Sequence, residues 1–276
     1  MSKIPTPSLS TLLSKLFTGM CLCTFISLSA EVETSEKYTK TYSLQGNNLT
    51  KLSGQFPCKI IIKRLPVGKK PSVVVKYGSK QNKETIEKYL KVEERNGELS
   101  IGFKEQYSEV GNGRSTFSFF KISFNKGETK EVKYRGGSHT ITFADGETLI
   151  LKEEELPVLT LHLPSTISDI ALSRTEATIE NGFFGGNGSL NLLKIHLRST
   201  GSLQIKGKVQ LKSVEISLRG GSYFAADEWH AKNMTLHSRG GSQFFIKELH
   251  ADALSLQLRG SSEAHFQALK VKEFKR

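Results

Sequence analysis

The sequence contains little cysteine: three residues in a chain of 276, two of which, Cys21 and Cys23, lie within the first 30 residues. If that segment is removed, Cys58 is the one cysteine left, which excludes an intramolecular disulfide. An exported chain without disulfides has to be stabilised by its hydrophobic core. Because Cys58 directly precedes a β-branched run that starts at Ile60, we interpret it as a buried and unreactive thiol.

The sequence also lacks an apolar run long enough to cross a membrane comfortably. Its uncharged stretch at residues 16–26 follows Lys3 and Lys15 and is followed by small residues at 27–30. A basic start, a short apolar run and a small-residue exit are typical of a secretory signal peptide. We therefore predict a signal peptide at residues 1–30, a mature chain without a transmembrane segment that begins near Glu31, and a polar leader at residues 31–48.

Acidic residues are fewer than basic ones: 27 aspartates and glutamates face 39 lysines and arginines, a formal net charge of +12. Removal of residues 1–30 takes away two lysines and leaves a charge of +10. Such an excess favours contact with polyanions, and it also aids solubility. With 24% charged and 37% hydrophobic residues, the composition is that of a globular protein and not of a disordered one.

The last third of the chain contains a repeat. An arginine followed by three small residues recurs at the positions 198–201, 219–222, 239–242 and 259–262. The spacings between the successive arginines are 21, 20 and 20 residues, for Arg198, Arg219, Arg239 and Arg259. A fixed period near 20 is typical of stacked-coil architectures.

The spacing within each repeat indicates the kind of coil. Val214, Ile216 and Leu218 alternate with Glu215 and Ser217, and this period of two is typical of a strand with one solvated face. Three short strands fit into each repeat and leave no room for a helix. We therefore predict an all-β protein, with a right-handed parallel β-helix of about 20-residue coils over residues 157–276 and a β-rich N-terminal portion.

Details of this β-helix follow from the same parity. Residues 216, 236 and 256 should form one interior ladder, and Leu258 and Leu269 should also point inward. The first repeat has one additional residue, which we place at the Lys206-Gly207-Lys208 corner. The glycine-rich segment 181–188 is expected to lengthen one coil.

The front half of the chain is predicted to be β-rich as well. Residues 49–104 are typical of strands, with a short helical turn at Thr85–Tyr89 and a hairpin at Asn96-Gly97. Residues 105–156 are less regular and are interpreted as an insertion with a hairpin at Asp145-Gly146. Within it, Arg135-Gly136-Gly137-Ser138 copies the repeat pattern outside its period, and both coincidence and a distant coil remain open.

These residues resemble a known family, the head GIN domain of putative auto-transporter adhesins, a secreted bacterial domain of unknown function. The resemblance lies in a strand, a small-residue turn and a further strand, repeated; the turns here are 200–202, 220–222, 240–242 and 260–262. Leu65–Val75 and Val92–Ile101 are similar to the front of that domain. The resemblance covers roughly residues 49–104 and 157–272 and implies a parallel β-helix outside the cytoplasm, without an established activity. The arginine before each turn is not part of the family pattern.

The sequence contains no recognisable catalytic motif. Carbohydrate-cleaving enzymes need converging carboxylates, but Asp227, Glu228, Glu248 and Asp252 are interleaved with lysines, so we interpret them as a solvated, salt-bridged face. His230 and His250 lie one coil apart, at an expected distance of about 5 Å. The residues in phase with them, Gln210 and Lys270, supply no third metal ligand. We therefore expect no catalytic residue, no metal and no cofactor.

Three functional classes are compatible with this sequence: a binding or adhesion module, a polysaccharide-active enzyme on a β-helix, and a purely structural envelope protein. The first class is favoured, with an exported protein in the periplasm, at the outer membrane or outside the cell. The expected partner is an acidic polysaccharide, lipopolysaccharide or another envelope polyanion, and no nucleic acid. The candidate ligand-binding residues form one column of like phase, although copying of the repeat also explains them: Arg198, Arg219, Arg239 and Arg259.

Overall fold

The computed structural model describes residues 38–46, 48–104, 107–112, 122–124, 128–130, 138–184 and 190–275, and only the backbone of the three short ranges between 107 and 130. The predicted signal peptide, the start near Glu31 and the Arg135-Gly136-Gly137 segment lie outside these ranges, as do residues 185–189 of the predicted coil insertion. The described chain is all-β, as predicted, with one α-helix and one short 3-10 helix. Residues 38–276 group into one unit.

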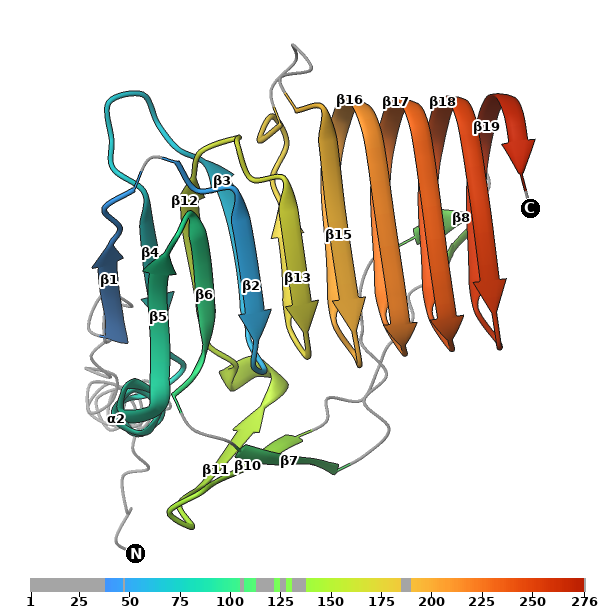
Figure 1. The fold of residues 1–276 in the computed structure, drawn as a ribbon. Coiled ribbons are helices and arrows are strands. Elements are labelled where there is room, and N and C mark those ends of the chain that lie inside the picture. Colours follow the sequence, from blue (N-terminus) through green and yellow to red (C-terminus); the bar gives the residue numbers. More distant parts are fainter. Residues whose placement is uncertain are drawn as a thin grey trace, which may run out of the picture. The chain divides into compact units, whose positions relative to one another are not determined.

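The repeat forms a stack of parallel strands (Figure 1), and each strand pairs with the next over almost its whole length. The strands of this coil stack are β15 (Leu192–Arg198), β16 (Ser202–Gly220), β17 (Tyr223–Gly240), β18 (Gln243–Arg259) and β19 (Glu263–Lys275). Between β16 and β17, three runs starting at residues 202, 208 and 213 pair with runs starting at 223, 228 and 233. These runs are the three short strands that the sequence predicts for each coil.

The additional residue of the first repeat lies at the predicted corner. Ile205 pairs with Ala226, but Lys208 pairs with Glu228, so the offset between partners changes from 21 to 20 across Lys206 and Gly207. Gly207 has a φ of 76°, and its N–H donates to Asp227 Oδ2 at 2.8 Å. The inserted residue is therefore absorbed in one corner, and the arginines on either side of it stay in phase.

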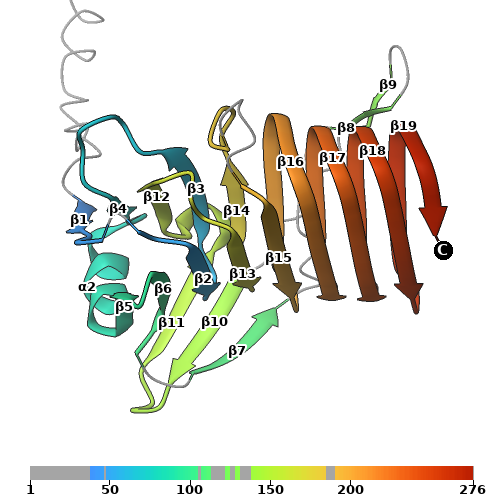
Figure 2. The same ribbon diagram turned by 45° about the horizontal axis from the view of Figure 1, so that its top comes forward.

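Strands from the front half of the chain continue the coil stack. The strands β13 (Asp169–Ser173) and β14 (Glu176–Ile179) pair in parallel with β15 and β16, and on their other side with β2 (Lys51–Gln55) and β3 (Lys59–Arg64). Figure 2 shows β13 and β14 beside β15 and β16. The sequence period did not predict this pairing, because the paired strands are more than 100 residues apart. Since β16 pairs with both β14 and β15, the sheet curls around a common interior.

Antiparallel strands and a helix complete the front of the sheet. The strand β4 (Ser72–Lys76) lies between β1 (Thr39–Ser43) and β12 (Val158–Leu163), and β12 is parallel to β3. The hairpin of β5 (Leu90–Arg95) and β6 (Glu98–Phe103) turns at Asn96-Gly97, as predicted, and β6 pairs with β2.

The predicted helical turn at Thr85–Tyr89 is confirmed as the end of a longer helix, α2 (Lys80–Tyr89). The Ser79 side chain caps this helix by accepting from the Asn82 N–H at 3.2 Å. Helix α2 contacts the second predicted hairpin, β10 (Ser138–Phe143) and β11 (Thr148–Lys152), through the rings of Tyr89 and Phe143, whose centroids are 3.6 Å apart.

The remaining elements belong to the segment that was interpreted as an insertion. The strand β7 (Tyr107–Asn112) pairs with β10 in a three-stranded sheet, and β8 (Ile122–Phe124) pairs with β9 (Glu128–Lys130). The 3-10 helix η2 (Glu153–Glu155) leads from β11 towards β12.

One continuous cluster of buried side chains fills the interior of the described sheet. Ile216, Leu236 and Leu256 form the predicted ladder, with exposures of 0%, 0% and 9%. Leu258 and Leu269 follow the inward parity but are 41% and 45% exposed. The reason is that β19, within the described chain, pairs only with β18, so side chains near that edge lack the covering coil that the parity assumes.

Candidate functional site

The turn after each arginine fixes where the coil corner lies. Gly220 and Gly240 adopt φ of 79° and 95°, a conformation that residues with a Cβ rarely adopt. A Cβ on Gly240 would also lie 3.0 Å from the carbonyl oxygen of Gly220. The buried Ser242 hydroxyl then donates to this same carbonyl oxygen at 2.9 Å and so ties one corner to the previous one. The small-residue turn therefore sets a constant height for the arginine before it.

The four predicted arginines form a column on the outer surface. Arg219 pairs with Arg239, and Arg239 pairs with Arg259, while β15 reaches the same position at Arg198. All four side chains are exposed. Neighbouring strands place them about 4.8 Å apart. In the part of the chain that the structure describes, no acidic side chain pairs with any of these guanidinium groups.

A column of polar residues runs beside the arginines, two residues earlier in each strand. It consists of Ser217, His237 and Gln257 on neighbouring strands, and His237 Nδ1 lies 3.0 Å from Gln257 Oε1. Two residues earlier again in the strands, Lys194 and Glu215 form an ion pair at 3.6 Å. The arginine column thus borders a strip of hydrogen-bonding groups that suits sugar hydroxyls or oxyanions.

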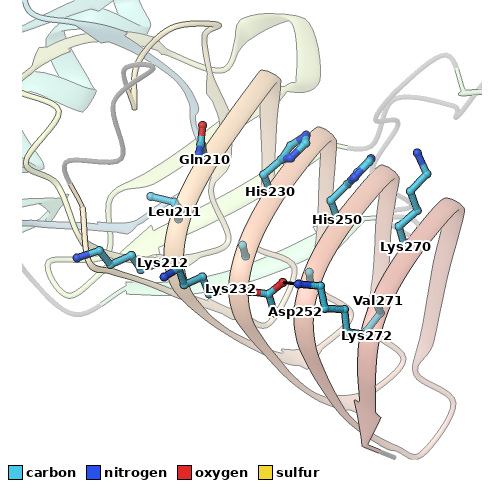
Figure 3. Close-up of a pocket in the computed structure, with 12 residues that line it drawn as sticks. Gln210, Leu211, Lys212, His230, Lys232, His250, Asp252, Lys270, Val271 and Lys272 are labelled. Atoms are coloured by element: carbon cyan, nitrogen blue, oxygen red, sulfur yellow. Dashed lines mark ion pairs between the residues drawn. The ribbon is translucent and has the colours of Figure 1, made fainter.

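A second feature of the coil stack, which the sequence did not predict, is an open groove of 960 Å³ (Figure 3). It crosses all four coils from β16 to β19. The row of residues along it is Gln210, His230, His250 and Lys270, and its floor is the row Leu211, Ala231, Ala251 and Val271. Lysines at 212, 232 and 272 form a further row, together with Asp252. We call this feature the histidine groove.

The two histidines of the groove lie next to each other, as predicted, and their rings stack. Their ring centroids are 4.4 Å apart and the planes differ by 14°. His230 Nε2 lies 2.7 Å from Glu228 Oε1, and His250 Nε2 lies 2.6 Å from Glu248 Oε1. Two parallel rings do not direct their lone pairs at one point. Among the described residues no group of three histidine, cysteine or carboxylate side chains is arranged to hold a metal ion.

The carboxylates near the groove are salt-bridged, in agreement with the interpretation from the sequence. Lys208 pairs with Glu228 at 2.6 Å, Lys247 with Asp227 at 2.5 Å, and Lys272 with Asp252 at 2.9 Å. The hydrogen bond from Lys208, and then that from His230, lowers the pKa of Glu228. The hydrogen bond from His250 lowers the pKa of Glu248. Neither carboxyl is set up to hold a proton at neutral pH, which a general acid must do.

One protein family matches the part of the chain that carries the arginine column and the histidine groove. The model of one family, described as "Putative auto-transporter adhesin, head GIN domain", matches residues 65–272. The chain belongs to this family. The match spans the arginine column, the histidine groove and all but the last three residues of the coil stack of this head GIN domain. It begins within the front half, as the sequence resemblance implied.

Solved structures similar to this head GIN domain are described as adhesins or lipid-binding proteins. A putative adhesin from Bacteroides fragilis shares 13% identity over 86% of this chain and 92% of that chain, with a TM-score of 0.41. A putative adhesin from Parabacteroides merdae shares 10% over 86% and 95%, with a TM-score of 0.37. A putative lipid binding protein from Parabacteroides distasonis shares 11% over 88% and 98%, with a TM-score of 0.36. The family assignment therefore rests on the sequence match.

No curated protein matches the chain. Among the helices that the structure describes, none is long and apolar enough to span a membrane.

One half-buried carboxyl of the head GIN domain, that of Glu176, was missed by the sequence reasoning. Burial raises the pKa of Glu176 to about 7, although Lys59, 4.0 Å away, opposes this shift and Glu153 adds to it. The alternating pattern of β14 places Glu176 outward, and only the distant segments around Lys59 and Glu153 cover it. Cys58 is buried, as predicted, and burial raises the pKa of its thiol, which keeps the thiol protonated and unreactive.

Proposed function

We propose that this head GIN domain is a non-catalytic binding module of the bacterial cell envelope, whose coils form a right-handed parallel β-helix. The parallel pairing of residues 20 apart along β16 to β19 supports the β-helix. The lysines, short apolar run and small residues at 1–30 support export to the periplasm, the outer membrane or the cell exterior. Sequencing the N-terminus of the protein from an envelope fraction tests export: the account expects a start near Glu31, and an intact Met1 in the cytoplasm contradicts it.

The arginine column is proposed as the binding surface for an acidic polysaccharide, lipopolysaccharide or another envelope polyanion. The observation that carries this proposal is the in-register column of four exposed arginines without acidic partners in the described chain. Exposed like charges at such spacing repel by about 1 kcal/mol or less per neighbour. Regularly spaced carboxylates, sulfates or phosphates relieve this repulsion, because each guanidinium group can bind one bidentately.

The neighbouring polar strip supports a glycan over a simple ion. Ser217, Thr235, Ser255 and Gln257 all lie on the outward side of the strands that end at the arginines. Sugar hydroxyls can pair with these groups while the acidic substituents meet the arginines.

A quadruple Arg→Gln variant at 198, 219, 239 and 259 tests this proposal. Binding to heparin and to lipopolysaccharide is measured at low and at moderate salt. The variant should bind more weakly, with a shallower salt dependence, because fewer charges contact the ligand. A matched control replaces Lys63, Arg64, Lys69 and Lys70 by Gln, which removes the same charge from exposed positions far from the column in the sequence.

The control separates a specific column from a general charge effect. Equal weakening in both variants would reduce the column to part of the overall positive charge. Unchanged binding in the arginine variant would make the column a product of repeat duplication. A turnover assay on acidic polysaccharides tests the alternative of a polysaccharide-active enzyme, for which release of shortened products is the required result.

A further inference from the structure

The strand β19 has one edge without a partner strand in the described chain. It pairs in parallel with β18 on one side, and no described strand pairs with its other side. Figure 1 shows this strand at one end of the coil stack. Its residues Glu263–Lys275 therefore offer a row of backbone N–H and C=O groups to a further strand. Such an edge is a template for pairing with another chain.

The side chains of β19 follow the pattern of an interior coil and not that of a closing one. They continue the interior ladders of β18 with apolar residues: Ala264, Phe266, Leu269, Val271 and Phe274. A coil that closes a stack usually carries polar residues on the face that meets water. Leu269 and Phe274 are instead 45% and 53% exposed, although the residues with which they pair on β18 are buried. The strand is thus built to be covered by a further coil.

The exposed apolar surface of the described chain gathers at this edge. Of its five exposed large apolar side chains, three lie here: Leu258, Leu269 and Phe274. A hollow of 590 Å³ lies between the end of β18 and β19, and Leu258, Phe266 and Phe274 are among the residues that line it. Apolar side chains that form one patch, unlike single scattered ones, mark an interaction surface.

A second copy of β19 fits this edge when the two strands run antiparallel about a twofold axis at Leu269. In that register Leu269 faces its own copy, and Ala264 faces Phe274 of the second copy. At the corners the two rows are out of step, and there Phe266 faces Lys272. The axis pairs the start of one strand with the end of the other, so the rise of one coil matches the rise of the other.

The charges of β19 favour this register over its neighbours. It places Glu263 opposite Lys275 on the outward side. It also places His265 opposite Glu273, and both pairs form twice because of the symmetry. A shift by two residues in one direction would place Glu263 opposite Glu273, and a shift in the other direction would place Lys270 opposite itself. Shifts by one residue would bring apolar side chains opposite outward ones.

We propose that the open edge of β19 is a self-association site, at which two copies of this chain pair end to end into a symmetric dimer with one continuous sheet. The occupant is a second copy because the edge is complementary to itself in apolar contacts and in charge. Lysines on an edge strand usually oppose pairing, and here they select one register. The inference does not depend on what the arginine column binds.

The test is sedimentation velocity of the full mature chain, without ligand, from about 1 µM to about 100 µM. The dimer should predominate at the highest concentration and dissociate on dilution. A monomer at every concentration would overturn the inference.

A substitution at the axis shows whether β19 forms the contact. Leu269→Lys places two like charges against each other and should raise the dissociation constant of the dimer about tenfold or more. Because Leu269 is 45% exposed, the variant should stay folded, and a melting curve checks this. Val67→Lys is the matched control, since it adds the same charge at an exposed apolar side chain between β3 and β4 and should leave the dimer unchanged. A dimer that survives Leu269→Lys would overturn the inference.

An exchange of charges tests the register. Glu263→Lys alone and Lys275→Glu alone each place two like-charged pairs across the axis and should raise the dissociation constant about threefold or more. In the mixed dimer of these two variants, both pairs are again of opposite charge, so an equimolar mixture should recover the parent's dissociation constant. A mixture that associates as weakly as the single variants would overturn the proposed pairing.

The outcomes also separate this inference from the proposed function. Sedimentation requires no ligand, so a monomeric chain would overturn the self-association site and leave the arginine column untouched. Conversely, unchanged heparin binding by the quadruple Arg→Gln variant would count against the column and leave the dimer untouched.

Discussion

In the coils from β16 to β18, the corner after the arginine is turned by glycine, whereas the corresponding residues of the two preceding coils are Arg174 and Ser199. Gly220 and Gly240 have φ of 79° and 95°, and Arg174 and Ser199 have φ of 57° and 58°. The corner therefore has the same left-handed conformation throughout, but the preceding coils adopt it with residues that carry a Cβ.

The corner at Arg174 lies between β13 and β14, which pair with the distant strands β2 and β3, and contacts with that distant segment hold this corner. Thr175 is buried, and its hydroxyl donates to the carbonyl oxygen of Phe56 at 2.9 Å, a residue that is 119 positions away. Long-range contacts of this kind hold a strained corner in place. In the later coils glycine makes the same corner without strain.

The largest effect is expected from a charge in the interior ladder of the later coils. Leu236→Asp places a carboxylate between Ile216 and Leu256, where it has no polar partner, and should cost more than about 4 kcal/mol of unfolding free energy. Thermal or urea unfolding measures it. His237→Asp, on the exposed side of the same strand, is the control and should change stability by less than about 1 kcal/mol. Equal melting of Leu236→Asp and the parent would refute the register.

The coil of β13 and β14 should also give the protein a pH dependence, through Glu176. Because folding raises the pKa of Glu176 to about 7, the folded state binds more protons than the unfolded state above the ordinary pKa of 4.5. The contribution of Glu176 to the free energy of unfolding is therefore complete below pH 4.5 and is lost as the pH rises towards 7. Glu176→Gln should remove this loss, which amounts to about 3 kcal/mol at most, since 23% of the side chain is exposed.

Urea unfolding of Glu176→Gln and the parent at several pH values between about 4 and about 8 measures this difference. The surface substitution Glu84→Gln, at a side chain that is 69% exposed, is the control. If the stabilities of Glu176→Gln and the parent run parallel over the whole range, the burial of Glu176 does not influence its proton affinity.

A smaller effect is expected at the corners themselves. Gly240→Ala forces a Cβ into a left-handed conformation, 3.0 Å from the carbonyl oxygen of Gly220, and should cost about 1–3 kcal/mol. Ser199→Gly, at the corner that already tolerates a Cβ, should change stability by less than about 1 kcal/mol. Chemical unfolding of both variants compares the corners, and equal costs would remove the distinction between them.

The smallest effect concerns the arginines in the absence of ligand. Arg239→Gln relieves repulsion with Arg219 and Arg259 and should raise the unfolding free energy by about 1 kcal/mol or less at low salt. The gain should vanish at high salt, because exposed charges are screened. A loss of stability at low salt would mean that the arginine has a structural role instead.

The sequence predicted the features that repeat locally. Ile216, Leu236 and Leu256 form the expected ladder, and the additional residue lies at Gly207, because periods of 2 and 20 are visible within one continuous segment. The pairing of β2 and β3 with β13 and β14 has no such period, since the partners are more than 100 residues apart. Burial of Glu176 was missed for the same reason.

Of the two candidate sites, one was predicted from the repeat and the other was not. The arginine column was predicted because one residue type recurs in phase. The histidine groove was not, because no single residue type recurs along it: its outward row is Gln210, His230, His250 and Lys270. The repeat of His230 and His250 in phase is the one signal in the sequence that points to it.

The central claim is that neighbouring arginines act together on one anionic ligand. The most direct measurement is a pair of double-mutant cycles for heparin binding, one for Arg219→Gln with Arg239→Gln and one for Arg198→Gln with Arg259→Gln. The first pair is one coil step apart, and the second is three steps, about 14 Å, apart. The account predicts a coupling above about 0.5 kcal/mol for the neighbours and additive effects for the distant pair. Additive effects in both cycles, or no loss of binding in any of the variants, would contradict it.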